Sequence, residues 1–191
     1  MKPSVRKKFV TPETGKLLVA EPFQKESFFK RAVVLICQHD QKGTVGLIIN
    51  KITDLMINDA IEDFPQFEAA VYFGGPEKTD NIFYVHTYGE EIEGSVKIAD
   101  GIYWGGNFEL LKVLIESNKI DLNRIRFIAG YCGWLPEEFN KDLKENLWWV
   151  SEANKKIIFE DNADDTWGHA LSDMGNQYAI MSHFSEDPNS N

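Results

Sequence analysis

Apolar residues along the chain gather in short runs, and the two strongest runs predict a pair of neighbouring β-strands. Residues 32–37 (AVVLIC) are apolar at every position, which is typical of a strand buried on both faces of a sheet. Residues 45–49 (VGLII) follow a polar connector that contains Asp40 and Gly43, residue types that favour tight turns. The pattern therefore predicts an antiparallel hairpin within a sheet.

Other short apolar runs predict the rest of this sheet. We expect further strands at residues 17–20, 70–73, 82–86, 96–98, 102–104, 125–131, 148–150, 157–159 and 178–181. The segment 125–131 (IRFIAGY) is expected to be another buried strand, and 82–86 carries apolar side chains on both faces.

Helical spacing of apolar residues marks a smaller number of segments. The clearest helix is predicted after Asn107, which is a suitable N-cap for a stripe formed by Phe108, Leu111 and Ile115. A second helix is expected to begin at Pro136, since proline is favoured in the first turn. Weaker patterns predict helices near 57–64 and 164–174. Because strands come in runs before single helices, we predict an α+β fold, a single-domain mixed sheet with several packed helices.

Length and composition support one globular domain. The chain has 191 residues, of which 43% are hydrophobic and 13% aromatic, and this content is too apolar for intrinsic disorder. We expect an irregular N-terminal arm at 1–14, one domain at 15–184 and a frayed C-terminal tail at 185–191. No linker or internal repeat divides the chain.

The charge is acidic and unevenly distributed. The net charge is −10, yet residues 1–8 carry four cations and no acid, so residues 9–191 carry −14. Such a surface repels duplex nucleic acid unless a local basic patch overcomes it. Direct DNA binding is therefore disfavoured.

The two cysteines and the chain start indicate the compartment. Cys37 and Cys132 lie far apart and form no CxxC motif, and the basic start is not followed by an apolar signal region. The longest apolar run, 32–37, is far shorter than the roughly 20 residues that span a bilayer. We expect a cytoplasmic protein with reduced thiols and no membrane partner.

Motifs for common chemistries are missing from the sequence. It contains no GxSxG, GxxxxGK[ST], GxGxxG, HExxH or EF-hand pattern, and its four histidines fall in four different segments. We therefore expect no cofactor and no metal, and we favour a protein that is not an enzyme.

Some residues still form candidate sites. Cys37 and His39 are two apart on a predicted strand, so the thiol and imidazole would share a face as an activated thiolate or half of a metal site. The alternative is a buried structural cysteine beside a solvent-exposed histidine, and it is the better interpretation. Cys132 could lie beside the N-terminus of the helix that starts at Pro136, or in a tight turn.

Glycine corners and polar strand ends provide further candidates. Residues 73–76 (FGGP) could form an anion-binding nest or a plain turn, and the turn is favoured. Asn50 ends an apolar strand and could line a crevice. The candidate ligand or partner site comprises His39, Asn50, Gly74, Gly75, Cys132 and Trp134, which could converge in one place or determine the fold separately.

Several segments resemble the bacterial AlgH/YqgE family. Residues 15–51 (GKLLVAEPFQKESFFKRAVVLICQHDQKGTVGLIINK) look like its opening signature, and FGGP, FYVH, AGYCGW and WGHALSDMG follow in order. The resemblance implies an AlgH-like single-domain fold in the bacterial cytoplasm and no established reaction. The family name derives from a proposed regulatory role in alginate production. This chain departs from the family pattern at Gln38 and at 135–139 (LPEEF).

The resemblance marks particular positions as characteristic of the family. In this sequence they are Pro22, Phe29, Arg31, Cys37, His39, Gly46, Asn50, Gly74, Gly75, Pro76, Gly130, Gly133 and Trp134.

These observations leave three hypotheses in order of preference. The first is a non-enzymatic binding or regulatory module whose partner is another protein. The second is a thiol- or nucleotide-handling enzyme that uses Cys37 with His39, or Cys132. The third is a direct DNA-binding regulator, which the family name suggests and the acidic body disfavours.

Overall fold

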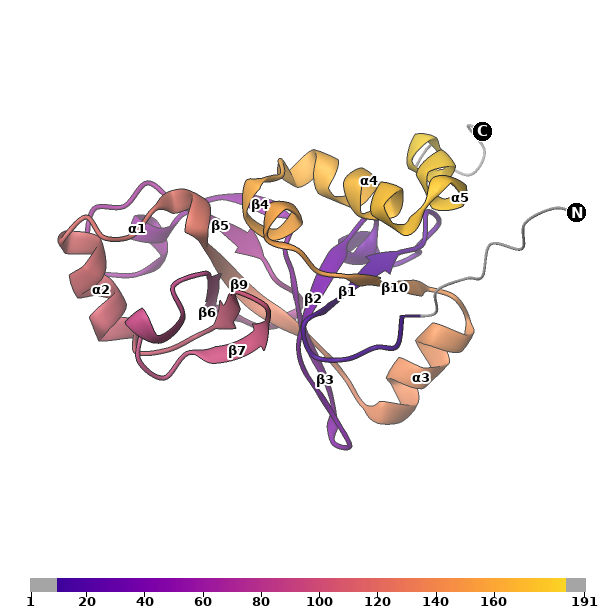
Figure 1. The fold of residues 1–191 in the computed structure, drawn as a ribbon, viewed down its shortest axis with the longest axis horizontal. Helices are drawn as coiled ribbons and strands as arrows, with labels where there is room; N and C mark the ends of the chain where they lie inside the picture. Colours follow the sequence, from indigo (N-terminus) through magenta and orange to yellow (C-terminus); the bar gives the residue numbers. More distant parts are fainter. Residues whose placement is uncertain (1–9, 185–191) are drawn as a thin grey trace, which may run out of the picture.

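A curled mixed sheet forms the centre of the molecule (Figure 1). The computed structural model describes residues 10–184, so most of the expected arm at 1–14 and all of the tail at 185–191 lie outside the described residues. The strands of this part are β1 Lys16–Ala20, β2 Val33–Asp40, β3 Gly43–Ile48, β4 Ile52–Met56, β5 Ala70–Phe73, β6 Glu77–His86, β7 Val96–Ala99, β8 Ile102–Trp104, β9 Ile125–Trp134 and β10 Trp148–Glu152.

The strand order explains how the sheet curls. Its main path runs β10-β1-β2-β3-β9-β6-β8-β7, and β4 with β5 forms a ribbon that joins at β9. The pairing of β5 with β9 is parallel, whereas the other pairs in the described chain are antiparallel. The predicted hairpin of β2 and β3 is confirmed, and so is the α+β mixed sheet.

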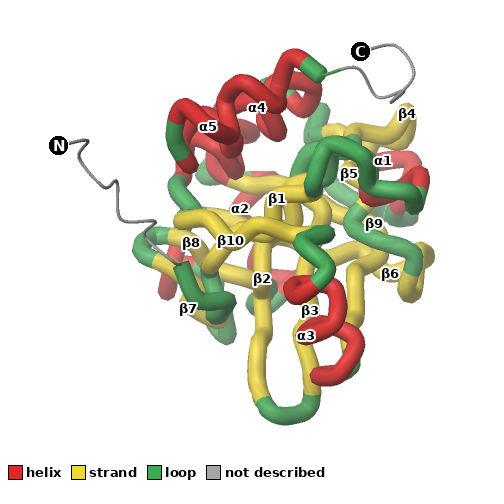
Figure 2. The backbone as a smooth tube through the Cα atoms, turned by 90° about the vertical axis from the view of Figure 1, so that its right-hand side faces the viewer, coloured by secondary structure: helices red, strands yellow, loops and turns green. Residues whose placement is uncertain are grey.

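Helices cover the sheet from different sides. They are α1 Ile57–Ala60, α2 Phe108–Glu116, α3 Pro136–Lys144, α4 Ala163–Met174 and α5 Asn176–Ala179. The Asn107 side chain accepts a hydrogen bond from the Leu110 backbone N–H at 2.9 Å, which confirms the predicted N-cap of α2. Figure 2 shows α4 and α5 together above β1 and β10, with α3 on another side of the sheet.

The hydrophobic core has three parts that follow from this arrangement. Alternate residues of β1 and β2 point to opposite faces, where α4 covers one face and α3 covers the other. The third part lies under α2 and includes Tyr84 and Phe127. No helix between residues 10 and 184 is long and apolar enough to cross a membrane.

Two predicted strands are wrong. Residues 157–159 lie in a π-helical turn, Lys156–Glu160, and residues 178–181 lie in α5 and the 3₁₀ turn after it. The Asn154 side chain accepts a hydrogen bond from the Ile157 N–H at 2.9 Å and so helps to start the turn. The apolar triplet is buried without pairing to the sheet, and burial alone cannot distinguish a strand from a turn.

The segment after β3 also differs from its prediction. The helix expected at 57–64 ends at Ala60, and the strand β4 that precedes it was not predicted. Ile57 is fully buried, but Ile61 lies outside the helix and is only partly buried. Most of β4 is exposed, so it lacks the continuous apolar run of a central strand.

Candidate functional site: a cavity around a buried arginine

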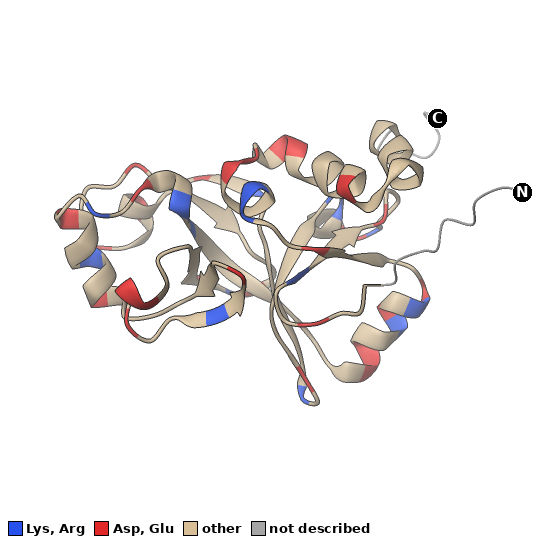
Figure 3. Cartoon of the chain, in the orientation of Figure 1, with Lys and Arg blue, Asp and Glu red and all other residues tan. Residues whose placement is uncertain are grey.

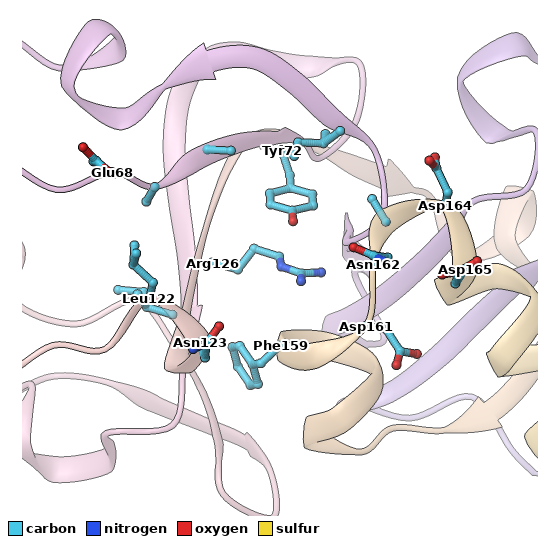
Figure 4. Close-up of a pocket in the computed structure, with 15 residues that line it drawn as sticks. Glu68, Tyr72, Leu122, Asn123, Arg126, Phe159, Asp161, Asn162, Asp164 and Asp165 are labelled. Atoms are coloured by element: carbon cyan, nitrogen blue, oxygen red, sulfur yellow. The ribbon is translucent and has the colours of Figure 1, made fainter.

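A cavity of about 560 Å³ opens where the β4–β5 ribbon, the start of β9 and the segment before α4 meet (Figure 4). Its size falls within the range of about 300–1,000 Å³ that is typical of small-molecule sites. Tyr72 of β5 and Phe159 of the π-helical turn give it aromatic lining, and Asn123 and Asn162 give it amide groups. The cavity thus combines aromatic and aliphatic side chains with many polar and charged groups.

Arg126 of β9 lies at the centre of this cavity (Figure 4). The residue is only 6% exposed, and its Nη1 donates a hydrogen bond to the Ile49 carbonyl oxygen at 2.6 Å. A guanidinium has five N–H donors. The donors on Nε and Nη2 make no hydrogen bond to any residue from 10 to 184. A buried cation therefore keeps unused donors at the cavity.

The surroundings of Arg126 keep it charged despite its burial. Burial lowers the pKa of the guanidinium, and the nearby Tyr72 and Asp161 act in the opposite direction. Its central carbon lies 4.3 Å from the centre of the Tyr72 ring, which is cation–π geometry. Arginine remains protonated in proteins under such conditions. The cavity therefore contains a permanent positive charge.

Carboxylates also line the cavity, mainly on the side of α4. Asp161 is buried, and its Oδ2 lies 2.8 Å from Nδ1 of His169. Asp164 and Asp165 are exposed in the first turn of α4, where Figure 3 shows acidic residues gathered, and Glu68 is exposed. The lining thus carries more negative than positive charge.

The sequence does not predict this site, because its residues lie far apart along the chain. Arg126 interrupts an otherwise apolar strand, and a charge inside a buried strand was the available signal. The carboxylates of 161–165 lie 35 residues or more away in sequence and form no known motif, so nothing connected them to the strand.

The structure brings three of the predicted site residues together at the FGGP corner. The Cys132 thiol donates to the Gly74 carbonyl at 3.3 Å, and Gly75 packs directly against the Tyr131 carbonyl. A Cβ on Gly75 would overlap that carbonyl. The contacts are backbone packing between β9 and the loop after β5.

Two other predicted residues lie near α3. The Trp134 Nε1 donates to Oδ2 of Asp142 at 3.1 Å, and burial raises the pKa of that carboxyl. The His39 ring lies 5.3 Å from the Phe139 ring, and its Nδ1 lies 2.8 Å from Thr44 Oγ1. Trp134 also lines a smaller hollow of about 340 Å³.

Asn50 is separate from both groups. Its side-chain oxygen accepts from the Val33 N–H at 2.8 Å, and its side-chain nitrogen donates to the Arg31 carbonyl at 2.9 Å. It therefore ties the start of β2 to the end of β3. None of the six predicted residues lines the Arg126 cavity.

The expectation that Cys37 and His39 share a face is wrong. The register of β2 against β3 shifts between Ile36 and Gln38, which makes Cys37 the extra residue of a β-bulge. Cys37 points into the core part under α4, whereas His39 packs on Phe139 of α3. Burial raises the pKa of the Cys37 and Cys132 thiols.

Comparison with known proteins gives the family. A family model described as AlgH-like matches residues 17–179. The chain belongs to the AlgH-like family. A UPF0301 protein of Bacteroides thetaiotaomicron is 40% identical over 184 residues, covering 95% of this chain and 93% of the relative. A UPF0301 protein of Cytophaga hutchinsonii is 36% identical over 178 residues, covering 93% and 98%.

Solved structures show the same fold at low identity. A crystal structure of a Corynebacterium diphtheriae protein matches with a TM-score of 0.78 and 22% identity, covering 93% of this chain and 95% of the other. The solution structure of AlgH from Pseudomonas aeruginosa matches with a TM-score of 0.73 and 20% identity, covering 93% and 98%. These relatives support an AlgH-like α+β fold, and their names state no activity.

The chemistry available to this AlgH-like chain at the cavity is polar recognition. Arg126 supplies donors with a fixed charge, Asp161 and its neighbours supply acceptors, and Tyr72 supplies an aromatic face. Within residues 10–184, side chains of His, Cys, Asp and Glu do not gather in groups of three placed to hold a metal ion. The two thiols lie outside the cavity lining.

Proposed function

We propose that this AlgH-like protein is a non-enzymatic binding module of the bacterial cytoplasm and that its ligand places a carboxylate on Arg126. The observation that carries the proposal is a guanidinium that is 6% exposed yet leaves its Nε and Nη2 donors unused at a cavity of about 560 Å³. Arginine matches a carboxylate with two parallel hydrogen bonds.

The energetics of burial support a binding role for Arg126. Removing a cation from water is costly unless it gains partners. The protein gives Arg126 one carbonyl and one aromatic face, and its remaining donors are open to the cavity. A bound carboxylate would complete the set of hydrogen bonds.

The same geometry favours binding over the alternatives. A thiol enzyme needs an accessible thiolate, but Cys37 and Cys132 are 3% and 1% exposed and burial raises the pKa of both. A nucleotide would bring more negative charge against the carboxylates of the lining than a single carboxylate does. The −14 charge of residues 9–191 opposes duplex DNA.

The mouth of the cavity also suits a protein partner. Ile52 and Leu122 line it and are 57% and 44% exposed. Contiguous exposed apolar surface is a common feature of sites where one protein contacts another. We expect a second protein to contact this mouth, either by offering the carboxylate or by recognising the occupied state.

The proposal is tested by the thermal stability of the purified protein with a panel of carboxylates, including amino acids, dicarboxylates and short peptides. A specific ligand at 100 times its Kd stabilises the native state by about 2.7 kcal/mol. Arg126→Gln removes the guanidinium, and Arg126→Lys keeps the charge without the paired donors. The matched control is Arg124→Gln, because Arg124 also stacks on a tyrosine, Tyr88 at 4.1 Å, but does not line the cavity.

We expect a member of the panel to stabilise the wild type and Arg124→Gln, with the effect lost in Arg126→Gln and weakened in Arg126→Lys. Circular dichroism establishes that each variant is folded. Failure of every carboxylate to stabilise the wild type would overturn the proposal.

A further inference from the structure

The charges of the Arg126 cavity are arranged in two zones. The guanidinium lies deep between Tyr72 and Phe159, while carboxylates lie around it (Figure 4). Asp161, Asp164 and Asp165 belong to the α4 side, and Glu68 lies on the opposite side (Figure 4). Carboxylate residues therefore lie on both sides of the guanidinium (Figure 4).

The outer carboxylates of the cavity are Asp164, Asp165 and Glu68. Within residues 10–184, Asp164, Asp165 and Glu68 form no ion pair with a lysine, arginine or histidine side chain. Asp161 differs, because its partner is His169. The three exposed carboxylates thus present unpaired negative charge at the entrance to a site with a buried positive charge.

This arrangement determines which distribution of charge on a ligand is favourable. One end of a dicarboxylate would pair with the guanidinium, but its other end would be repelled by the carboxylates of the cavity. An amine without a carboxylate would leave the unused donors of Arg126 unmatched. A ligand with an anion at one end and cations at the other satisfies both zones.

We infer that the ligand is a basic amino acid with a free α-carboxylate, present either as a free molecule or as the last residue of a peptide chain. The inference rests on the proposed function of the Arg126 cavity. The carboxylate pairs with Arg126, and the amino or guanidino groups pair with Asp164, Asp165 and Glu68. The aliphatic stem of a lysine or arginine spans the distance between the guanidinium and these carboxylates.

The experiment measures binding by calorimetry with defined probes at low salt. The probes are L-lysine, L-arginine, lysine amide, which lacks the carboxylate, norleucine, which lacks the side-chain cation, and succinate. An acetylated tetrapeptide ending in lysine, with its C-terminal amide as the matched blank, distinguishes a chain terminus from a free amino acid.

The variant that tests the outer zone is Asp164→Asn with Asp165→Asn. Its control is Asp80→Asn with Glu90→Gln, which removes the same charge from exposed carboxylates away from the cavity. We expect lysine, arginine or the lysine-ended peptide to bind, and lysine amide, the peptide amide and succinate to bind at least tenfold more weakly. The Asp164 and Asp165 variant should lose at least tenfold in affinity, whereas the control should keep wild-type affinity.

The outcomes separate the two proposals. Binding of the free amino acids alone supports a small molecule, and binding of the peptide alone supports a protein terminus. Tighter binding of succinate than of lysine, unchanged by the Asp164 and Asp165 substitutions, overturns this inference but leaves the carboxylate site intact. Absence of binding by every probe overturns this inference, and failure of the whole carboxylate panel to stabilise the wild type overturns both.

Discussion

The Arg126 guanidinium lies 4.3 Å from the centre of the Tyr72 ring, so a buried cation on β9 rests on an aromatic face of β5. The two strands pair in parallel, and Tyr72 is opposite Ile128 in the register. A desolvated cation–π contact contributes up to about 2 kcal/mol. The contact thus helps to keep a charged group inside the sheet without a carboxylate in direct contact.

The loss of stability on replacing Tyr72 should therefore depend on whether the new side chain has an aromatic ring. We expect Tyr72→Leu to lower the free energy of unfolding by about 1–3 kcal/mol, because the cation loses its aromatic face and the smaller side chain leaves unfilled space. Tyr72→Phe keeps the ring and should cost less than about 1 kcal/mol. Urea denaturation measures both, and equal losses in the two variants would show that the ring face has no role.

His86 should make the stability depend on pH. The ring is fully buried, its Nδ1 accepts from the Tyr88 N–H at 3.1 Å, and its Nε2 donates to the Gly105 carbonyl at 2.9 Å. These partners assign the neutral tautomer. Protonation would place a second donor against the Tyr88 N–H. Burial lowers the pKa of His86 from its usual 6.5, although the Gly105 hydrogen bond opposes the shift.

The sign of the effect follows from proton binding. Between the lowered native pKa and 6.5 the unfolded chain binds more protons than the native one, so stability falls as the pH falls. We expect a loss of up to about 1.4 kcal/mol for each pH unit in this window. Urea unfolding from pH 8 to pH 5 measures it, and His86→Gln should flatten the dependence. An unchanged slope in that variant would assign the effect to other groups.

The FGGP corner should tolerate no side chain at Gly75. Its φ is 149°, and a Cβ would overlap the Tyr131 carbonyl of β9, which belongs to the backbone and cannot rotate away. We expect Gly75→Ala to cost more than about 2 kcal/mol. Gly133→Ala on the same strand is the matched control, because its Cβ would meet only the Tyr131 ring at 3.4 Å, and it should be neutral within about 0.5 kcal/mol. Similar costs for both would contradict the packing argument.

Both cysteines should be inert in the native protein. Cys37 and Cys132 are buried in different core parts, and burial raises the pKa of each thiol, so little thiolate forms at neutral pH. We expect an aromatic disulfide reagent to label neither thiol under native conditions and both in denaturant. Rapid labelling of one thiol in the folded chain would revive the thiol-enzyme hypothesis.

The sequence predicted most of the fold because local signals agreed with the tertiary structure. Asn107 caps α2, Pro136 opens α3, and the apolar run at 32–37 lies in a central strand. The errors arose where an apolar segment is buried by something other than a sheet. At 157–159 the hydrogen bond from Ile157 to the Asn154 side chain favours a turn, and periodicity cannot detect this.

The candidate site was harder to predict because it depends on long-range placement. Arg126 and Asp161 meet only because β9 and the segment before α4 lie side by side in the folded chain, and no local pattern records this. The β-bulge at Cys37 was also not predictable from a local sequence pattern. One extra residue moves Cys37 and His39 to opposite faces, and the simple two-residue alternation of a strand does not include it.

The position of β9 in the chain has a consequence for synthesis on the ribosome. Its partners β3, β5 and β6 all precede it in sequence, so they leave the ribosome before the strand that joins them. Until residue 134 has emerged, these strands keep unpaired edges, which are prone to pair with other chains. We expect the nascent chain to need protection by chaperones during this interval, and a pause in translation before β9 would increase aggregation without changing the finished protein.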